Sequence, residues 1–201
     1  MSLLTRDFLN EYDVILASAS PRRKELLQLV CNNFRVIPSD CEEIIPPDLN
    51  PDDTAEYLSS LKCRSIAEVY RQSLVIGCDT AVICNGEIFG KPKDEEDAVI
   101  MLTKLSGKEH LVISGVTLGH RHRCRSFSNV TRVTFRTLSE KEINEYVASG
   151  EPMDKAGAYG IQGLGSLLIE RIEGDFYSVM GLPVSQLAEE IEKFLALIQS
   201  K

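Results

Sequence analysis

The sequence predicts an α/β fold in which a mixed, twisted sheet carries flanking helices. Short apolar stretches typical of buried strands alternate with stretches whose apolar residues recur at helical spacing. Two long β-rich stretches, 111–119 and 126–136, are joined by residues 120–125, which predicts a long antiparallel hairpin. A chain of 201 residues, 43% of them hydrophobic, suits one α/β domain or two small lobes that share a sheet.

The first expected strand and helix are joined by a serine-rich turn. Residues 14–17 are an apolar stretch that predicts a short buried strand. Ser20 is a suitable N-cap, and Pro21 a suitable first residue, for a helix that continues over 22–30. A second strand is expected over 34–37, where the next residue is a proline that ends it.

A loop and a helix precede the clearest strand of the chain. Residues 40–52 are acidic and rich in proline, which indicates a loop. Asp53 or Thr54 can cap a helix over 55–71. The long, mostly apolar stretch 74–84 then predicts a strand.

A hairpin and a helix follow this strand. The Asn-Gly pair at 85–86 is a turn signal, so residues 87–90 are expected to return as a short antiparallel partner. A helix is expected over 93–105, before the long hairpin.

The last part of the chain combines helices, a loop and a strand. Ser139 and Glu142 form a capping-box pattern that begins a helix. Residues 154–166 are rich in glycine and predict an ordered loop, and 167–172 predict a strand. Pro183 opens the last helix.

The charge and composition disfavour several classes of protein. A net charge of -8 is opposite to that of a general nucleic-acid binder, so neither nucleic acid nor an anionic membrane is expected as a partner. No apolar stretch approaches a membrane span, and residues 1–12 lack the apolar segment of a signal peptide. The six cysteines include no C-x-x-C pair, which favours reduced thiols in a cytoplasmic protein.

The turn Ser18–Lys24, with the sequence SASPRRK, is a candidate phosphate site. A turn into a helix N-terminus directs backbone N–H groups at one point, where an anion is favoured. The hydroxyls and the two guanidinium groups of Arg22 and Arg23 add donors that suit phosphate oxygens. A capped amphipathic helix with solvated charges explains the same residues equally well, and the sequence contains neither a P-loop nor a dinucleotide-binding motif.

Asp79 is a candidate metal ligand and general base, because it stands inside an otherwise apolar strand. A carboxylate there is unfavourable unless it is paired, hydrogen-bonded or bound to a metal. A structural ion pair is the alternative to a functional role. Gly77 permits close approach of a backbone or a ligand. Among the loop acids Asp40, Glu42 and Glu43, a metal role depends on whether the fold brings Glu43 beside Asp79.

Two lysines and one glutamine complete the candidates. Lys62, on an expected helix, and Lys91, after the short hairpin, are possible phosphate ligands, although most lysines simply lie at the surface. The glycine-rich stretch 155–165 can run its backbone against a ligand. Within it, Gln162 offers a donor and an acceptor suited to a base edge, whereas an irregular loop with glycines at its turns is the alternative.

The histidines carry a weaker signal. His120 and His122 have the spacing to share a metal on one strand face, but a solvated basic turn is the simpler interpretation. The lack of a well-placed histidine argues against a Ser-His-Asp hydrolase.

Several specific stretches occur in order over roughly residues 14–190: 16–27 (LASASPRRKELL), 77–80 (GCDT), 90–92 (GKP), 105–107 (LSG), 133–136 (VTFR), 154–163 (DKAGAYGIQG) and 181–183 (GLP). Together they resemble the Maf family of nucleotide pyrophosphatases. The resemblance implies a two-lobed fold, related to inosine-triphosphate pyrophosphatases, with a cleft between the lobes. It also implies one such domain over 1–201, a need for Mg²⁺ or Mn²⁺, and often a homodimer.

The resemblance also assigns roles to residues. Asp79 would be the general base and, with Glu43, a metal ligand. The triphosphate would be held by Ser18, Arg22, Arg23, Lys62 and Lys91.

The resemblance further implies a substrate. Arg22, Thr80 and Gln162 match the branch of the family that hydrolyses dTTP and UTP to the monophosphate and pyrophosphate, whereas the 7-methyl-GTP branch tends to have tryptophan, glutamine and glutamate at these places. The chain departs from the common pattern at Ala19, where glycine is frequent, and in a slightly extended N-terminus; neither touches a proposed functional side chain.

Two other functions stay open at this point. One is a pyrophosphatase for other or modified nucleotides, such as 7-methyl-GTP or inosine triphosphate. The other is a nucleotide-binding regulator of cell division without essential catalysis. The presence of Asp79, Glu43 and both lysines favours catalysis, because a protein that only binds nucleotide needs no base.

Overall fold

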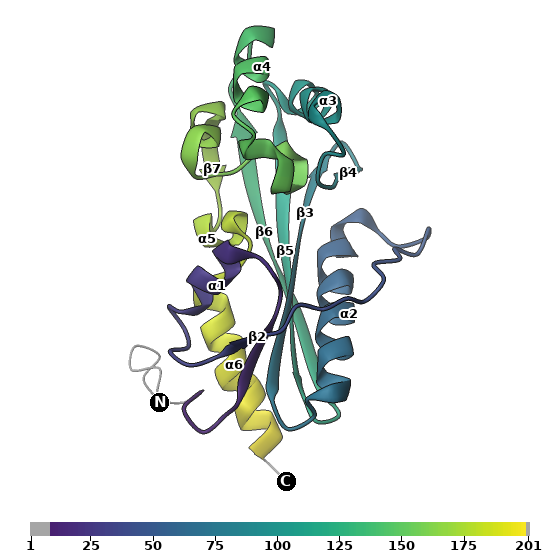
Figure 1. Cartoon of the computed structure of the whole chain (residues 1–201), viewed down its shortest axis with the longest axis vertical. Helices are drawn as coiled ribbons and strands as arrows, with labels where there is room; N and C mark the ends of the chain where they lie inside the picture. Colours follow the sequence, from purple (N-terminus) through teal and green to yellow (C-terminus); the bar gives the residue numbers. More distant parts are fainter. Residues whose placement is uncertain (1–8, 200–201) are drawn as a thin grey trace. The chain divides into compact units, whose positions relative to one another are not determined.

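The computed structural model describes residues 9–199 and shows the expected α/β fold (Figure 1). Its strands are β1 (Val14–Ala17), β2 (Arg35–Val36), β3 (Leu74–Cys84), β4 (Glu87–Phe89), β5 (Glu109–His120), β6 (Arg123–Phe135) and β7 (Ile169–Glu173). Within the described residues they form one seven-stranded sheet in the order β2-β1-β3-β5-β6-β7, with β4 paired to β3. The sheet is mixed, because β1 is parallel to β2 and β3, whereas β4 is antiparallel to β3.

The helices alternate with these strands along the chain. They are α1 (Pro21–Leu27), α2 (Thr54–Val69), α3 (Glu95–Leu105), α4 (Glu140–Ala148), α5 (Phe176–Met180) and α6 (Val184–Gln199). None of the helices found between residues 9 and 199 has the length and apolar character needed to cross a membrane. The N-terminal stretch considered above lies mostly outside the described residues, which begin at Leu9.

The chain divides into two compact units. The first unit comprises Met1–Asp79, Ser114–Asn129 and Gly181–Lys201, and the second comprises Thr80–Ile113 and Val130–Met180. Strands β3, β5 and β6 each run from one unit into the other.

Several element ends differ from the sequence prediction. Helix α1 ends at Leu27, because Leu29 and Val30 donate to carbonyls three residues back, which tightens the last turn and stops the α-helix. Strand β2 keeps only two residues. Helix α5 was not predicted, since its five residues are too few to show a helical period.

In the first unit, helix α2 packs closely on the sheet. Its Cys63 and Ile66 share a buried cluster with Ile15 of β1 and Val75 of β3. A Cβ on Gly77 would lie 2.4 Å from the carbonyl oxygen of Ser59, so only glycine lets the helix backbone approach β3 this closely. This close packing brings the next turn of α2 beside the residues that follow Gly77.

The basic tip of the long hairpin packs against helix α6. Arg125 pairs with Glu190, and Arg123 donates to the carbonyl of Leu197. His120 is buried, with its Nδ1 atom 3.2 Å from a backbone carbonyl oxygen. The interpretation of this tip as a solvated basic turn is confirmed for residues 121–126, which are all exposed, whereas His120 before them is buried.

In the second unit, the glycine-rich loop is anchored in an aromatic core. The rings of Tyr159 and Phe135 pack edge to face at 4.7 Å between centroids, and the Tyr159 hydroxyl is 2.7 Å from Nε2 of His110. Burial lowers the pKa of His110 to about 4, so this imidazole is neutral at physiological pH. Tyr159 therefore fixes this part of the loop to the core.

Candidate active site

Asp79 lies where strand β3 loses its burial. Strand β3 is buried along its length except at Asp79 and Thr80, which are half-buried. Because β1 is parallel to β3 with Ala17 opposite Gly77, Ser18 follows β1 at the level where β3 reaches Cys78. The carboxyl ends of parallel strands are the usual position of ligand sites in α/β sheets.

Lys62 joins two carboxylates in a small charged cluster. Its Nζ atom lies 2.5 Å from Oδ1 of Asp79 and 3.0 Å from Oε1 of Glu43. Burial disfavours the charged amine, but the attraction of Asp79 and Glu43 outweighs it and raises the pKa of Lys62. The fold thus brings Glu43 beside Asp79, the condition on which the metal hypothesis depended.

The two carboxylates fit a hard divalent cation. Both present oxygen atoms to the same point, which Lys62 now contacts as a cation. Magnesium is commonly bound through one or two carboxylates, with substrate phosphates and water completing its coordination. A closed all-protein site is absent from the part of the chain that the structure describes, where no three His, Cys, Asp or Glu side chains gather. Glu43 and Asp79 therefore suit an ion that arrives with, or is completed by, a phosphate ligand.

Arg23 links the serine-rich turn to the strand that carries Asp79. Its Nη1 atom donates to the carbonyl of Cys78 at 2.9 Å and to the Ser18 hydroxyl at 3.2 Å, while Nε donates to the carbonyl of Gly181 at 3.0 Å. Ser18 and Arg23 are thereby brought next to Asp79. Arg22, the preceding residue of α1, is half-buried.

The remaining predicted residues belong to the second unit. Thr80 is half-buried in β3, whereas Lys91 and Gln162 are exposed. The backbone N–H of Gly157 donates to the carbonyl of Gly90 at 3.0 Å. This bond ties the segment that carries Lys91 to the loop that carries Gln162.

Cys78 is not suited to nucleophilic catalysis, although it adjoins Asp79. Burial raises the pKa of the Cys78 thiol to about 11. The thiol is therefore protonated near neutral pH, and a protonated thiol is a poor nucleophile. The candidate reacting groups of this region are therefore the carboxylates and the cations around them.

Two functional candidates were missed by the sequence analysis. Glu151 and Tyr146 hold the glycine-rich loop through hydrogen bonds to its backbone. The loop residues that Glu151 binds lie 13 and 14 positions further along the chain, so no local pattern reveals them. The only sequence feature that could have indicated this role is a glutamate shortly before several glycines, and that pattern is too common to predict it.

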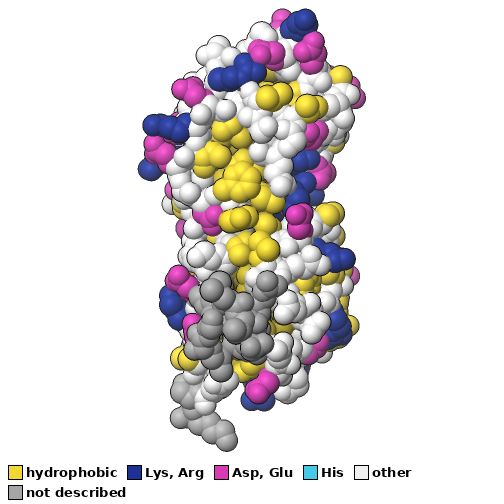
Figure 2. Space-filling model, turned by 90° about the vertical axis from the view of Figure 1, so that its left-hand side faces the viewer, with side chains coloured by type: hydrophobic (Ala, Val, Ile, Leu, Met, Phe, Trp, Pro, Cys, Tyr) yellow, Lys and Arg dark blue, Asp and Glu magenta, His cyan; other side chains and the backbone are white. Residues whose placement is uncertain are grey.

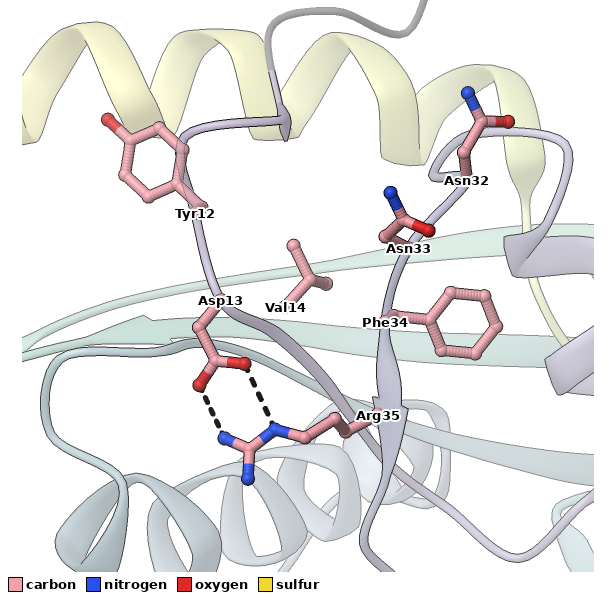
Figure 3. A pocket seen from close by; sticks show the side chains of 7 residues that line it. All are labelled: Tyr12, Asp13, Val14, Asn32, Asn33, Phe34 and Arg35. Carbon is pink, nitrogen blue, oxygen red and sulfur yellow. Dashed lines mark hydrogen bonds and ion pairs between the residues drawn. The ribbon is translucent and has the colours of Figure 1, made fainter.

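A surface hollow in the first unit lies among other residues (Figure 3). Figure 3 shows Asp13 and Arg35 facing each other there as an ion pair. None of the predicted site residues lines this hollow, whose lining is Tyr12, Asp13, Val14, Asn32, Asn33, Phe34 and Arg35. With its main charges paired internally, the hollow has no clear role in the chemistry of the Asp79 region.

Comparison with known proteins decides the family. A family model described as Maf-like protein matches residues 13–194, which is most of the chain. The chain belongs to the Maf family.

The Maf-family relatives include proteins named dTTP/UTP pyrophosphatase. The one from Bacillus pumilus is 44% identical over 181 residues, covering 90% of this chain and 96% of the relative. The one from Bacillus cytotoxicus is 47% identical over 180 residues, covering 90% and 94%. A solved structure titled "The structure of the Staphylococcus aureus Ham1 protein" covers 61% of this chain and 71% of that chain, at 17% identity and a TM-score of 0.47.

Proposed function

We propose that this Maf-family protein hydrolyses dTTP and UTP to the nucleoside monophosphate and pyrophosphate. The observation that carries the proposal is the cluster of Asp79, Lys62 and Glu43, which combines a base, a cation and a second carboxylate at one point. The names of the Bacillus relatives support the choice of substrate.

In the proposed reaction, water attacks the α-phosphorus. The new P–O bond forms as the bond from the α-phosphorus to the bridging oxygen breaks, and pyrophosphate leaves. Oδ1 of Asp79 is engaged by Lys62, so Oδ2 is the atom that takes the proton of the water. A divalent ion held by Glu43 and Asp79 would supply positive charge against the phosphates.

The cationic side chains bind and stabilise the triphosphate. Charge accumulates on the phosphate oxygens during phosphoryl transfer, and positioned cations stabilise it. The residues proposed for this role are Ser18, Arg22, Arg23, Lys62 and Lys91. Arg23 also keeps the backbone of Cys78 in place, and hence the start of the Asp79 region.

Thr80 and Gln162 are proposed to select the base. Gln162 is exposed on its loop and has both a donor and an acceptor, which suits the carbonyl and imide groups of thymine and uracil. A purine presents a different pattern, so the same side chain would pair with it less completely.

Pyrophosphate release from a panel of nucleoside triphosphates tests this function. The panel includes dTTP, UTP, CTP, GTP, 7-methyl-GTP and inosine triphosphate, each with Mg²⁺ or Mn²⁺ and with a chelator. We expect metal-dependent release concentrated on dTTP and UTP. Release concentrated on another nucleotide would contradict the substrate, and no release from any would favour a nucleotide-binding regulator.

We further propose that the protein is a homodimer, as the family resemblance implies, and that it is cytoplasmic, as its cysteine usage favours. Large apolar side chains are exposed in the second unit, namely Leu164, Leu167, Phe176 and Tyr177, each between 42% and 64% exposed. Figure 2 shows a face of the molecule on which apolar side chains reach the surface among charged ones. Light scattering coupled to gel filtration measures the mass, and a value near twice the 22.4 kDa of one chain is expected. A mass of one chain at micromolar concentration would contradict the dimer.

A further inference from the structure

Glu151 holds the backbone of the glycine-rich loop from one side. It lies in a short 3₁₀ turn, Glu151–Asp154, just after helix α4. Its carboxylate accepts from the N–H of Leu164 at 3.0 Å and from the N–H of Gly165 at 3.1 Å. Two successive N–H groups directed at one carboxylate form an anion-binding concavity of the backbone. The carboxylate is therefore a structural anion inside the loop.

Tyr146 extends this anchor to the other side of the loop. Its hydroxyl donates to Oε1 of Glu151 at 3.1 Å and accepts from the N–H of Gly160 at 3.2 Å. Burial raises the pKa of Tyr146, so the hydroxyl keeps its proton and can do both. Gly160 and Gly165 are thus fixed to one pair of side chains, and Gln162 lies between them in the sequence.

The glycines of the loop are explained by these side chains. A Cβ on Gly163, whose φ is +65°, would lie 2.7 Å from Oε2 of Glu151. A Cβ on Gly165 would lie 2.7 Å from the Tyr146 hydroxyl and 2.2 Å from the carbonyl oxygen of Gly160. The loop therefore closes tightly on itself around the anchor, which only glycine permits at these positions.

Gln162 itself has little else to orient it. Its side chain is exposed, and its backbone is extended, with φ at -101° and ψ at 169°. Within residues 9–199 no hydrogen bond holds its amide. The direction of Gln162 is thus set by the backbone on either side of it, which Glu151 and Tyr146 hold.

We propose that Glu151, acting with Tyr146, is a positioning residue for base selection. It fixes the loop backbone so that Gln162 meets the base in one orientation, and it does not itself contact the substrate. This inference rests on the proposed function, in which Gln162 reads thymine or uracil. Beyond that function, we infer that selectivity depends on the Glu151 carboxylate, although this group does not contact the base.

The test is the selectivity of Glu151→Gln, measured as kcat/KM for dTTP divided by kcat/KM for GTP. The amide keeps one acceptor oxygen, but its NH₂ group faces a backbone N–H, so one loop anchor is lost. We expect the ratio to fall at least about tenfold, through a lower kcat/KM for dTTP, while kcat/KM for GTP stays within about twofold. We expect a smaller fall for Tyr146→Phe, which keeps the carboxylate.

Glu142→Gln is the matched control. Glu142 also accepts from a backbone N–H and a hydroxyl, both of Ser139, and it pairs with Arg136, but it caps helix α4 and does not touch the loop. This variant should lose stability without changing the ratio. An equal fall of kcat/KM for all nucleotides in Glu151→Gln, or the same change of ratio in Glu142→Gln, would overturn the inference.

Gln162→Ala separates this inference from the proposed function. If Gln162→Ala lowers the ratio and Glu151→Gln does not, the positioning role fails while the proposed function stands. If both lower it, adding Glu151→Gln to Gln162→Ala should change the ratio no further, because the two act through one contact. If Gln162→Ala keeps the wild-type ratio, base reading by Gln162 is wrong, and the positioning role falls with it.

Discussion

Two carboxylates of this protein, those of Asp79 and Glu151, are engaged in opposite ways. Asp79 stands in strand β3 and faces a cation, Lys62, which a second carboxylate also contacts. Glu151 stands in a short turn and is occupied by backbone N–H groups and one hydroxyl. A carboxylate whose partner is a side-chain cation can exchange that partner for a metal ion or a substrate group, whereas one saturated by backbone donors serves to hold a loop. Under the proposed function, the partners of the two groups distinguish the region around Asp79, where we propose the reaction occurs, from the loop at Gln162, which we propose selects the base.

The largest expected effect is on the reacting region. Asp79→Asn removes the proposed base while keeping the shape of the side chain and its oxygen near Lys62. We expect kcat for dTTP to fall by about 10²- to 10⁴-fold, the usual contribution of general acid–base catalysis. Circular dichroism should show an unchanged fold. A kcat close to that of the wild type would mean that Asp79 is not the base, and that Asp79 and Glu151 do not differ in the way proposed.

The second effect concerns the metal. Glu43→Gln keeps an oxygen but loses the charge that a divalent cation requires. We expect the Mg²⁺ concentration for half-maximal activity to rise at least about 10-fold, because even the loss of a residue that only supports a metal ligand weakens binding by about that factor. The neighbouring Glu42→Gln is the control, since Glu42 is an exposed acid of the same loop. Equal shifts in the two variants would mean that the loop attracts cations only through its general charge.

A third prediction sharpens the selecting region. Gln162→Glu replaces a group that both donates and accepts by one that only accepts. We expect the ratio of kcat/KM for dTTP to that for GTP to fall about tenfold, with little change in the activity towards GTP. Steady-state kinetics on both nucleotides measures it. An unchanged ratio would mean that residues other than Gln162 select the base.

The smallest expected effect concerns His110, which we expect to change the stability of the fold and not the activity. Its folded pKa of about 4 lies below its ordinary value of 6.5, so the unfolded chain binds the proton more tightly. The contribution of the neutral His110 to the free energy of unfolding is therefore fully present above pH 6.5. It is lost as the pH falls towards 4, by about 3 kcal/mol in total. Urea unfolding between pH 7.5 and pH 4 should show a steeper loss for the wild type than for His110→Gln. Parallel curves for the two proteins would contradict this account of the aromatic core.

Much of the fold follows from local pattern in the sequence. The alternation of strands and helices, the long hairpin and the capping box at Ser139 all rest on residues close together in the chain. Asp79 was recognisable because a charge inside an apolar strand needs an explanation. Its proposed role as general base and metal ligand came from the family resemblance.

The parts that sequence analysis missed depend on distant partners. The ends of α1 and the existence of α5 are set by single hydrogen bonds and by few residues. The ion pair of Arg125 at the hairpin tip was not predictable, because its partner, Glu190, lies on a helix 65 residues further along the chain. Glu151 gained its role from a loop that folds back on it, which the spacing of glycines only suggests.

Hydrolysis of dTTP in water enriched in ¹⁸O reveals which phosphorus atom the water attacks. If water attacks the α-phosphorus, mass spectrometry should find the label in dTMP and none in pyrophosphate, in a reaction that Asp79→Asn slows by about 10²- to 10⁴-fold. Label in pyrophosphate, or products of dTDP and phosphate, would contradict the proposed chemistry at Asp79.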